Sequence, residues 1–211
     1  MKVYMRSIAS LVVGCLLAGT ALSASAAGPT RYQTANVWEP TATGPGENIG
    51  AAWLIREKQK IRGRMMSKVP TAGVPQTLWI VVFNNPSACA ASPCMDTDIP
   101  NAAVGASVFN GSGAISAADG NGSGVFNVDF ELPAGQLPDG LFVLVGDPKG
   151  LHRSRGFGAE VHLIIDEHPL PTDSWISDLT TTHFPGFGPN STVAVAVLLG
   201  CSGKSCPASV F

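Results

Sequence analysis

Three histidines in the second half of the chain are the side chains best suited to hold a metal ion. His162 falls within a predicted strand, His168 at the end of that strand, and His183 in a later loop. Neutral imidazoles beside a carboxylate are typical ligands of Zn²⁺ and Cu²⁺. Their spacing matches no compact metal motif, so structural or merely exposed histidines are the alternative to a copper or zinc site.

A run of basic residues between positions 56 and 68 is the strongest charge feature. Five of them recur at every second position: Arg56, Lys58, Lys60, Arg62 and Arg64. On one β-strand this spacing places all five on one face, as a positive stripe about 26 Å long. Such a stripe predicts salt-sensitive binding to anionic glycans or lipid headgroups. The alternatives are a solvated edge strand whose charges prevent aggregation, or a helix that scatters the charges.

Cysteines occur in two C-x4-C motifs near the middle and the end of the chain. The first motif holds Cys89 and Cys94, and the second holds Cys201 and Cys206. In an exported protein an even count at matched spacing favours disulfides, and of three connectivities we predict a bond within each motif. A zinc site built from all four thiolates is the alternative.

Signatures of common enzyme classes are missing from the sequence. Neither 110–113 nor 120–124 fits G-x-S-x-G, and the chain has no P-loop and no H-E-x-x-H motif. The segment 119–124 is like the start of a calcium loop, but the twelfth position is Phe130, so a glycine-rich turn explains it better. We therefore expect no cofactor and leave catalysis open, with a hydrolase of envelope polymers as one hypothesis.

The first residues have the pattern of a secretory signal peptide. Lys2 and Arg6 precede an apolar run from 8 to about 22, and small residues end at Ala27. We predict cleavage near Ala27 and a secreted or periplasmic protein, with a lipid anchor on Cys15 as the alternative. The run is shorter than a spanning helix requires and no later segment approaches that length, so no transmembrane segment is predicted.

Composition favours short strands joined by many turns. Glycine (24) and proline (16) are abundant among the 211 residues, while charged residues make up only 13 %. These values exclude a disordered, charge-rich chain and a helical bundle. Without the leader, eleven basic and all fifteen acidic residues remain. This mild balance does not suggest nucleic acid as a partner.

Apolar runs between turn signals predict seven or eight strands. Residues 78–83 read as a central strand buried on both faces, and 125–132 alternates as a half-buried strand does. Further predicted elements are strands at 104–109 and 113–118 around a turn at 110–112, strands at 141–145, 159–165 and 192–199, and a short helical segment within 171–183. Together they predict an all-β, two-sheet antiparallel β-sandwich, with a β-barrel as the alternative.

The chain divides into a leader at 1–27, an extended N-terminal segment at 28–50 and a single domain at 51–211. The run 77–94, then 160–168 and the terminal C-x4-C motif, resembles a group of uncharacterised secreted bacterial β-rich proteins with paired C-x4-C motifs. This resemblance covers about residues 60–211 and implies secretion, a β fold and the same cysteine pairing, but no chemistry. The leading hypothesis is therefore a secreted protein with a non-catalytic binding or envelope role, followed by a metal-binding periplasmic protein.

Overall fold

The computed structural model describes residues 29–121, 123–137, 143–168 and 191–207. The strands in this part of the chain are β1 (Arg31–Thr41), β2 (Gly44–Glu57), β3 (Lys60–Val69), β4 (Pro75–Phe83), β5 (Ala106–Ile115), β6 (Ala117–Ala118), β7 (Gly124–Pro133), β8 (Val143–Gly146), β9 (Glu160–Glu167) and β10 (Ser191–Leu198). Two short 3-10 helices, η1 (Pro86–Ala88) and η2 (Asp96–Asp98), follow β4. The all-β class is therefore confirmed. The predicted leader and the helical segment within 171–183 lie outside the described residues.

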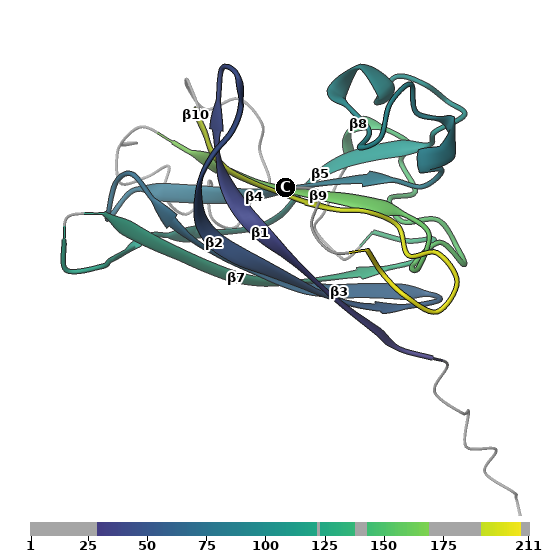
Figure 1. Ribbon diagram of the computed structural model, residues 1–211, viewed down its shortest axis with the longest axis horizontal. Coiled ribbons are helices and arrows are strands. Elements are labelled where there is room, and N and C mark those ends of the chain that lie inside the picture. Colours follow the sequence, from purple (N-terminus) through teal and green to yellow (C-terminus); the bar gives the residue numbers. More distant parts are fainter. Residues whose placement is uncertain (1–28, 122, 138–142, 169–190, 208–211) are drawn as a thin grey trace, which may run out of the picture.

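All these strands belong to one antiparallel sheet. Their order is β6-β7-β3-β2-β1-β10-β9-β4-β5-β8, so β6 and β8 are the edges within the described ranges. The sheet is open, and the alternative of a closed barrel does not hold. Figure 1 shows that the sheet bends over, with β4, β5 and β9 in one layer and β2, β3 and β7 in the other.

A single main core fills the space between the layers. Leu78, Ile80 and Phe109 from one layer share it with Leu54, Met65 and Phe126 from the other. The two layers of the predicted sandwich are therefore halves of one continuous sheet. The chain changes layer at the buried Ser116, because β5 pairs with β4 whereas β6 pairs with β7. A strand that bends at a corner in this way is a usual device for joining packed layers.

The segment 28–50, expected as a lead-in before the domain, supplies central strands. β1 lies between β2 and β10 in the sheet. Ala35 and Val37 of β1 are buried in the main core, and the residues before and after each of them are more exposed. The apolar side chains therefore alternate with polar ones as in any half-buried strand, although the segment is rich in proline, threonine and glycine.

β4 is buried along its whole length, as predicted for the run 78–83. Its inner face joins the main core. Its outer face contributes Val81 and Phe83 to a second, smaller cluster with Cys94 and Val104, which come from the loop between β4 and β5. This loop, at residues 84–105, covers the outer face of β4 and forms a cap on the sandwich.

The predicted turn at 110–112 is a β-bulge inside one strand, so the two strands expected around it are wrong. Leu78 pairs with Ser112 and Trp79 with Asn110, which leaves Gly111 as the extra residue of β5. A Cβ atom at Gly111 would collide with the Ile80 side chain. Glycine at this position therefore marks close packing. In the sequence a bulge resembles a turn, because glycine is common in both.

The two layers meet at a seam between β1 and β10, which has little backbone pairing. Among the described residues, Trp38 opposite Val195 is the only bridge of this seam. Side chains complete the junction: the buried guanidinium of Arg56 donates hydrogen bonds to the carbonyl oxygens of Gly156 (3.1 Å), Ala159 (2.9 Å), Leu198 (3.1 Å) and Leu199 (3.2 Å) and to Oε1 of Gln33 (2.7 Å). Burial lowers the pKa of Arg56 to about 10, and the charge of nearby Glu160 opposes that shift. Arg56 therefore stays protonated at neutral pH.

Disulfides join Cys89 to Cys94 and Cys201 to Cys206, the connectivity that the spacing predicts. The first bond lies in the cap loop, and the second closes a short loop after β10. Both span only five positions, so each constrains its own loop more than the whole chain. In the described part of the chain, no helix has the length and apolarity needed to cross a membrane.

Candidate functional site

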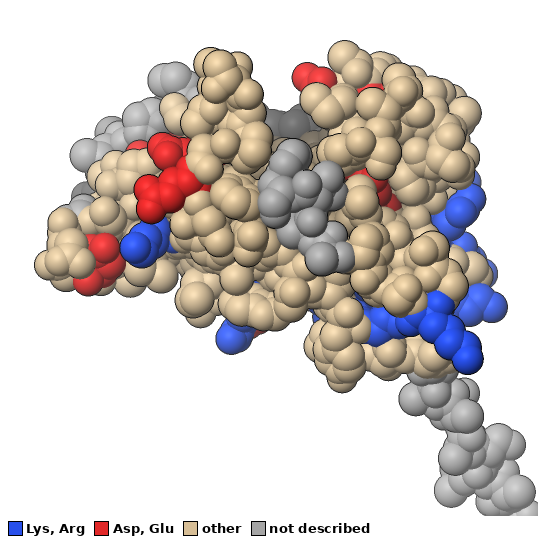
Figure 2. All heavy atoms as spheres, viewed as in Figure 1, with Lys and Arg blue, Asp and Glu red and all other residues tan. Residues whose placement is uncertain are grey.

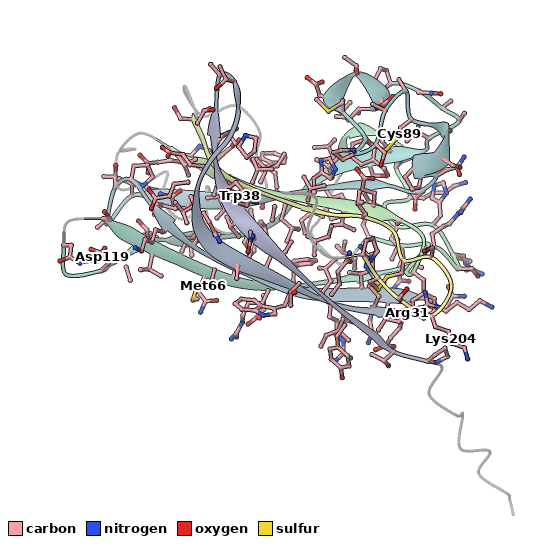
Figure 3. The ribbon with its side chains drawn as sticks, viewed as in Figure 1. Arg31, Trp38, Met66, Cys89, Asp119 and Lys204 are labelled. Atoms are coloured by element: carbon pink, nitrogen blue, oxygen red, sulfur yellow. A yellow bond between two sulfur atoms is a disulfide. The ribbon has the colours of Figure 1, made fainter. Side chains whose placement is uncertain are left out.

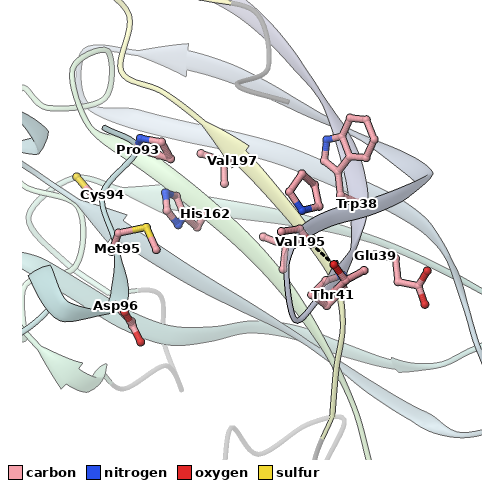
Figure 4. A pocket seen from close by; sticks show the side chains of 13 residues that line it. Trp38, Glu39, Thr41, Pro93, Cys94, Met95, Asp96, His162, Val195 and Val197 are labelled. Atoms are coloured by element: carbon pink, nitrogen blue, oxygen red, sulfur yellow. Dashed lines mark hydrogen bonds between the residues drawn. The ribbon is translucent and has the colours of Figure 1, made fainter. Parts of the chain in front are cut away.

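A cleft of about 410 Å³ opens between the tip of the β1–β2 hairpin and the cap loop. Its lining residues are Trp38, Glu39, Pro40, Thr41, Gly44 and Pro45 from the hairpin, Pro93, Cys94, Met95 and Asp96 from the cap loop, His162 from β9, and Val195 and Val197 from β10. Figure 4 shows the two walls facing each other across His162 and the β10 valines. This volume falls within the range of small-ligand sites.

The hairpin wall forms because β1 leaves β10 after Trp38. Beyond that residue β1 pairs only with β2 among the described strands, through Pro40 opposite Pro45 and Thr41 opposite Gly44. Proline has no backbone N–H to give to a neighbouring strand, so Pro40 cannot extend the pairing with β10. The hairpin tip then stands away from the sheet, as Figure 1 shows.

The opposite wall is held by one buried carboxylate. Asp98 accepts hydrogen bonds from the backbone N–H groups of Ala90 and Met95, both at 2.9 Å. These bonds lower the pKa of Asp98, with the bond from Ala90 contributing most. Since Asp98 ties the two ends of the disulfide segment, it fixes Met95 and Asp96 where they face the cleft.

His162 forms the floor together with a buried partner. Its Nε2 lies 2.6 Å from Oε1 of Glu160, which is only 2 % exposed and also accepts the backbone N–H of Cys94 at 2.7 Å. Phe83 packs beside the imidazole, with the ring centroids 4.9 Å apart. Because a carboxylate accepts hydrogen bonds, Nε2 is the donor in this contact.

The predicted metal site is wrong in its pairing of histidines. His162 and His168 are six positions apart along and just beyond β9, which separates them by about 20 Å in an extended strand. A shared ion would need their nitrogens within about 4 Å. His168 instead contacts the hydroxyl of Thr77 at 2.9 Å. The third predicted ligand, His183, lies outside the described residues.

The four cysteines do not form the alternative zinc site either. Cys89, Cys94 and Asp98 are the only described cluster of three close metal-ligand side chains. The two sulfur atoms of this cluster are bonded to each other as a disulfide, and zinc is bound by thiolates. The cluster therefore braces the cap loop.

The predicted basic stripe is divided between two strands and two faces. Lys58 lies in the turn between β2 and β3, so Arg56 pairs with Ile61 and points into the core, whereas Lys60 lies on the outer face of β3. Arg62 and Arg64 are also on that outer face, where Arg62 Nη2 lies 2.9 Å from Glu57 Oε1. The five positions are therefore not one continuous charged surface.

The outer-face cations are neutralised by acidic partners on neighbouring strands. Lys60 Nζ lies 3.5 Å from Glu131 Oε1, and Arg64 binds both carboxylate oxygens of Asp129 at 2.7 and 2.8 Å. The hydrogen bond from Arg64 lowers the pKa of Asp129. A shallow depression of about 480 Å³ lies among these pairs and Trp53. Since its positive and negative side chains are paired, this surface attracts anions weakly.

Five other cations lie on segments that meet at one end of the molecule, which we name the basic end: Arg31, Lys58, Arg153, Arg155 and Lys204. Figure 2 shows several Lys and Arg side chains over this end and the larger patch of acidic side chains toward the opposite one. Figure 3 places Arg31 and Lys204 together at this end and Asp119 at the other. Among the described residues, none of the five has an ion-pair partner.

Backbone contacts of one loop assemble the basic end. In the segment 150–158, Gly156 N–H donates to the Lys58 carbonyl at 3.3 Å, and Phe157 accepts the N–H of Cys201 at 2.7 Å. The guanidinium of Arg31 packs 4.1 Å from the centre of the Phe157 ring. This loop thereby brings the β2–β3 turn, the start of β1 and the second disulfide loop together. Sequence reasoning missed this site because its members are far apart along the chain and no local pattern links them.

Comparison of this chain with protein families, curated proteins and solved structures finds no match.

Proposed function

We propose that this protein is exported and acts as a non-catalytic binding protein, attached to an anionic glycan of the cell envelope through the basic end. The observation that supports this function is that five cations on four separate segments gather at one end and have no ion-pair partner among the described residues. Cations that form no ion pair keep more of their field for an external anion than paired ones do. The cations on the outer face of β3 do not keep this field, because they are paired with carboxylates.

The chemistry of the basic end suits carboxylate, sulfate or phosphate groups on a polymer. Three of its five cations are arginines, whose planar guanidinium binds such groups through two parallel hydrogen bonds. The five cations come from four separate segments, so the contacts spread over a surface instead of a pocket. A polymer with regularly repeated charges can bridge such a surface, whereas a single small anion would engage only part of it.

A glycan fits this end better than a lipid surface. Stable membrane attachment needs an inserted apolar group in addition to basic residues, and the described loops 58–59, 150–158 and 201–207 expose no large apolar side chain, which leaves Tyr32 with its polar hydroxyl as the exposed ring beside them. Tyr32, next to Arg31 on β1, is 75 % exposed. Its ring offers a flat apolar surface with a polar tip, on which a sugar ring can stack.

A matched pair of double variants tests this function on a heparin column. Arg153→Gln with Arg155→Gln should elute at clearly lower NaCl, and the slope of log retention against log salt should fall by about one to two, because up to two ionic contacts are lost. The control is Arg62→Gln with Arg64→Gln, which removes the same charge from the paired outer face. It should elute close to the unchanged protein.

Two results would overturn the proposal. Equal shifts for both double variants would mean that retention reports net charge and no particular surface. Binding to phosphatidylglycerol vesicles without binding to heparin would assign the basic end to a lipid surface instead.

A further inference from the structure

The outer face of the layer that contains β1, β2 and β3 exposes a large apolar side chain on each of these strands. They are Tyr32 on β1, Trp53 on β2, which is 37 % exposed, and Met66 on β3, which is 42 % exposed. Ile55 lies opposite Tyr32 and Ala51 lies opposite Met66, so Trp53 is diagonal to both. Diagonal neighbours on one face of a sheet are about 7–8 Å apart. The three exposed side chains therefore follow one line across three strands.

A paired arginine and aspartate lie directly beside the middle of this line. Arg64 is opposite Trp53 on one side and opposite Asp129 on the other. Its Nε and Nη2 bind the two carboxylate oxygens of Asp129, which holds the guanidinium in place beside Trp53. Both side chains are more than half exposed. Among the described residues no acceptor binds Nη1 of Arg64, and a carboxylate has room for further donors. The pair therefore offers both donors and acceptors to a ligand.

The shallow depression beside Trp53 is balanced in charge. Its charged lining consists of Arg62, Arg64, Asp129 and Glu131, which are two cations and two carboxylates. A charged polymer gains little from such a surface, because attraction to one sign is offset by repulsion from the other. Hydroxyl groups both donate and accept hydrogen bonds, so they match neighbouring guanidinium and carboxylate groups. The lining therefore favours an uncharged ligand that is rich in hydroxyl groups.

A sugar chain suits this surface better than a protein partner. The centre of a protein–protein interface is depleted of charged residues, whereas here four charged side chains lie in the same depression as Trp53 and Ile55. A pyranose ring with equatorial substituents has two flat faces made of C–H groups, which pack on the face of an indole. Its hydroxyl groups project around the rim, where they meet charged side chains that border the aromatic ring.

We propose that this outer face binds an uncharged glycan chain of β-linked pyranose rings with equatorial substituents. One ring stacks on Trp53, where Nη1 of Arg64 donates to a hydroxyl group and Asp129 accepts from another. Neighbouring rings of the chain pack on Tyr32 and Met66. This second glycan site requires no charge on the polymer, so it goes beyond attachment through the basic end. Tyr32 lies at the border of the two sites.

Affinity electrophoresis in native gels tests the site with two uncharged probes, hydroxyethylcellulose and glycol chitin. They differ in an N-acetyl group, so the pattern of retardation identifies the preferred ring substituent. At least one polymer should retard the unchanged protein, and added NaCl should leave the retardation intact, since no counterions are released. Trp53→Ala should weaken binding about tenfold or more. Trp53→Tyr, which keeps a flat ring, should retain most of it.

Two further variants examine the polar contacts and the specificity of the effect. Asp129→Ala should weaken binding about threefold, because an acceptor is lost and Arg64 is no longer held in place. The matched control is Ile115→Ala, which truncates an exposed apolar side chain on β5. It should be retarded like the unchanged protein.

Reciprocal measurements separate this proposal from the proposed function. Arg153→Gln with Arg155→Gln should bind the uncharged polymers normally, even where its retention on heparin falls. Trp53→Ala should keep its retention on heparin, which also shows that this variant is folded.

No retardation by either polymer, or equal retardation of Trp53→Ala and the unchanged protein, would overturn the proposal. So would concentration-dependent self-association that Trp53→Ala removes, because the face would then belong to a second copy of the chain.

Discussion

Arg56 shows how a residue that resembles a surface cation in the sequence becomes part of the core. Its side chain is fully buried and its donors meet four backbone carbonyls and Gln33. A buried charge is tolerated when hydrogen bonds replace the lost water. Each of these acceptors is itself buried or partly buried, so removing the guanidinium would leave several of them unsatisfied.

We expect Arg56→Met to lower the free energy of unfolding by about 3–5 kcal/mol, because the acceptors around it lose their donor. Urea denaturation followed by circular dichroism measures this change. Lys58→Met, in the exposed turn two residues later, should change the value by no more than about 0.5 kcal/mol. Unchanged or increased stability in Arg56→Met would show that apolar packing alone holds the seam.

His168 gives the native state a dependence on pH. Burial lowers the pKa of His168 more than the charge of Asp166 raises it, so the folded protein keeps this imidazole neutral. The unfolded chain takes up the proton near the ordinary value of 6.5. Stability should therefore fall as the pH drops below about 6.5 toward the lowered native value.

His168→Gln removes this titration. The loss of unfolding free energy between pH 7.5 and pH 5.5, measured by urea denaturation, should be smaller in the variant than in the unchanged protein. An equal loss in both would mean that other groups account for the pH dependence.

At the scale of elements, the sequence predicted strands well where alternation was regular. The predicted strand 125–132 is β7 to within one residue at each end, and its alternation of buried and exposed residues is as expected. The turn at Lys58–Gln59 was missed because it contains no glycine, proline, asparagine or aspartate. Crossing that turn reverses which alternate positions face outward, and this is why the basic stripe is divided.

Gly111 was misread for the opposite reason, since asparagine and glycine side by side are typical of hairpin turns. We expect Gly111→Ala to lower the free energy of unfolding by about 1–3 kcal/mol, because the added methyl group overpacks against Ile80. Gly158→Ala is a suitable control, since the nearest atom to its Cβ is 3.9 Å away at the end of a flexible arginine. Equal melting temperatures for Gly111→Ala and the unchanged protein would contradict the packing argument.

At the scale of the whole molecule, the charge is distributed by loops that the sequence pattern does not connect. Arg31, Lys58 and Lys204 come from three segments far apart in the sequence, and meet because Phe157 and its loop bind all three segments. The cleft is equally dispersed, with Trp38 on one wall and Met95 on the other. The sequence could predict the β class and the two disulfides, but neither the basic end nor the cleft, since both depend on contacts between distant segments.

The seam between β1 and β10 has a consequence for how the protein would resist tension. These strands run antiparallel, so the start of β1 and the end of β10 lie at the same end of the molecule. Pulling the two ends of the described chain apart would separate β1 from β10 one contact at a time, instead of loading all contacts of the seam together. Within the described residues, the first links to be loaded are the bonds of Gln33 and Arg56 to the end of β10 and the segment after it, and the lone backbone bridge at Trp38 follows. If the protein were held at both ends, the seam would therefore open at low force.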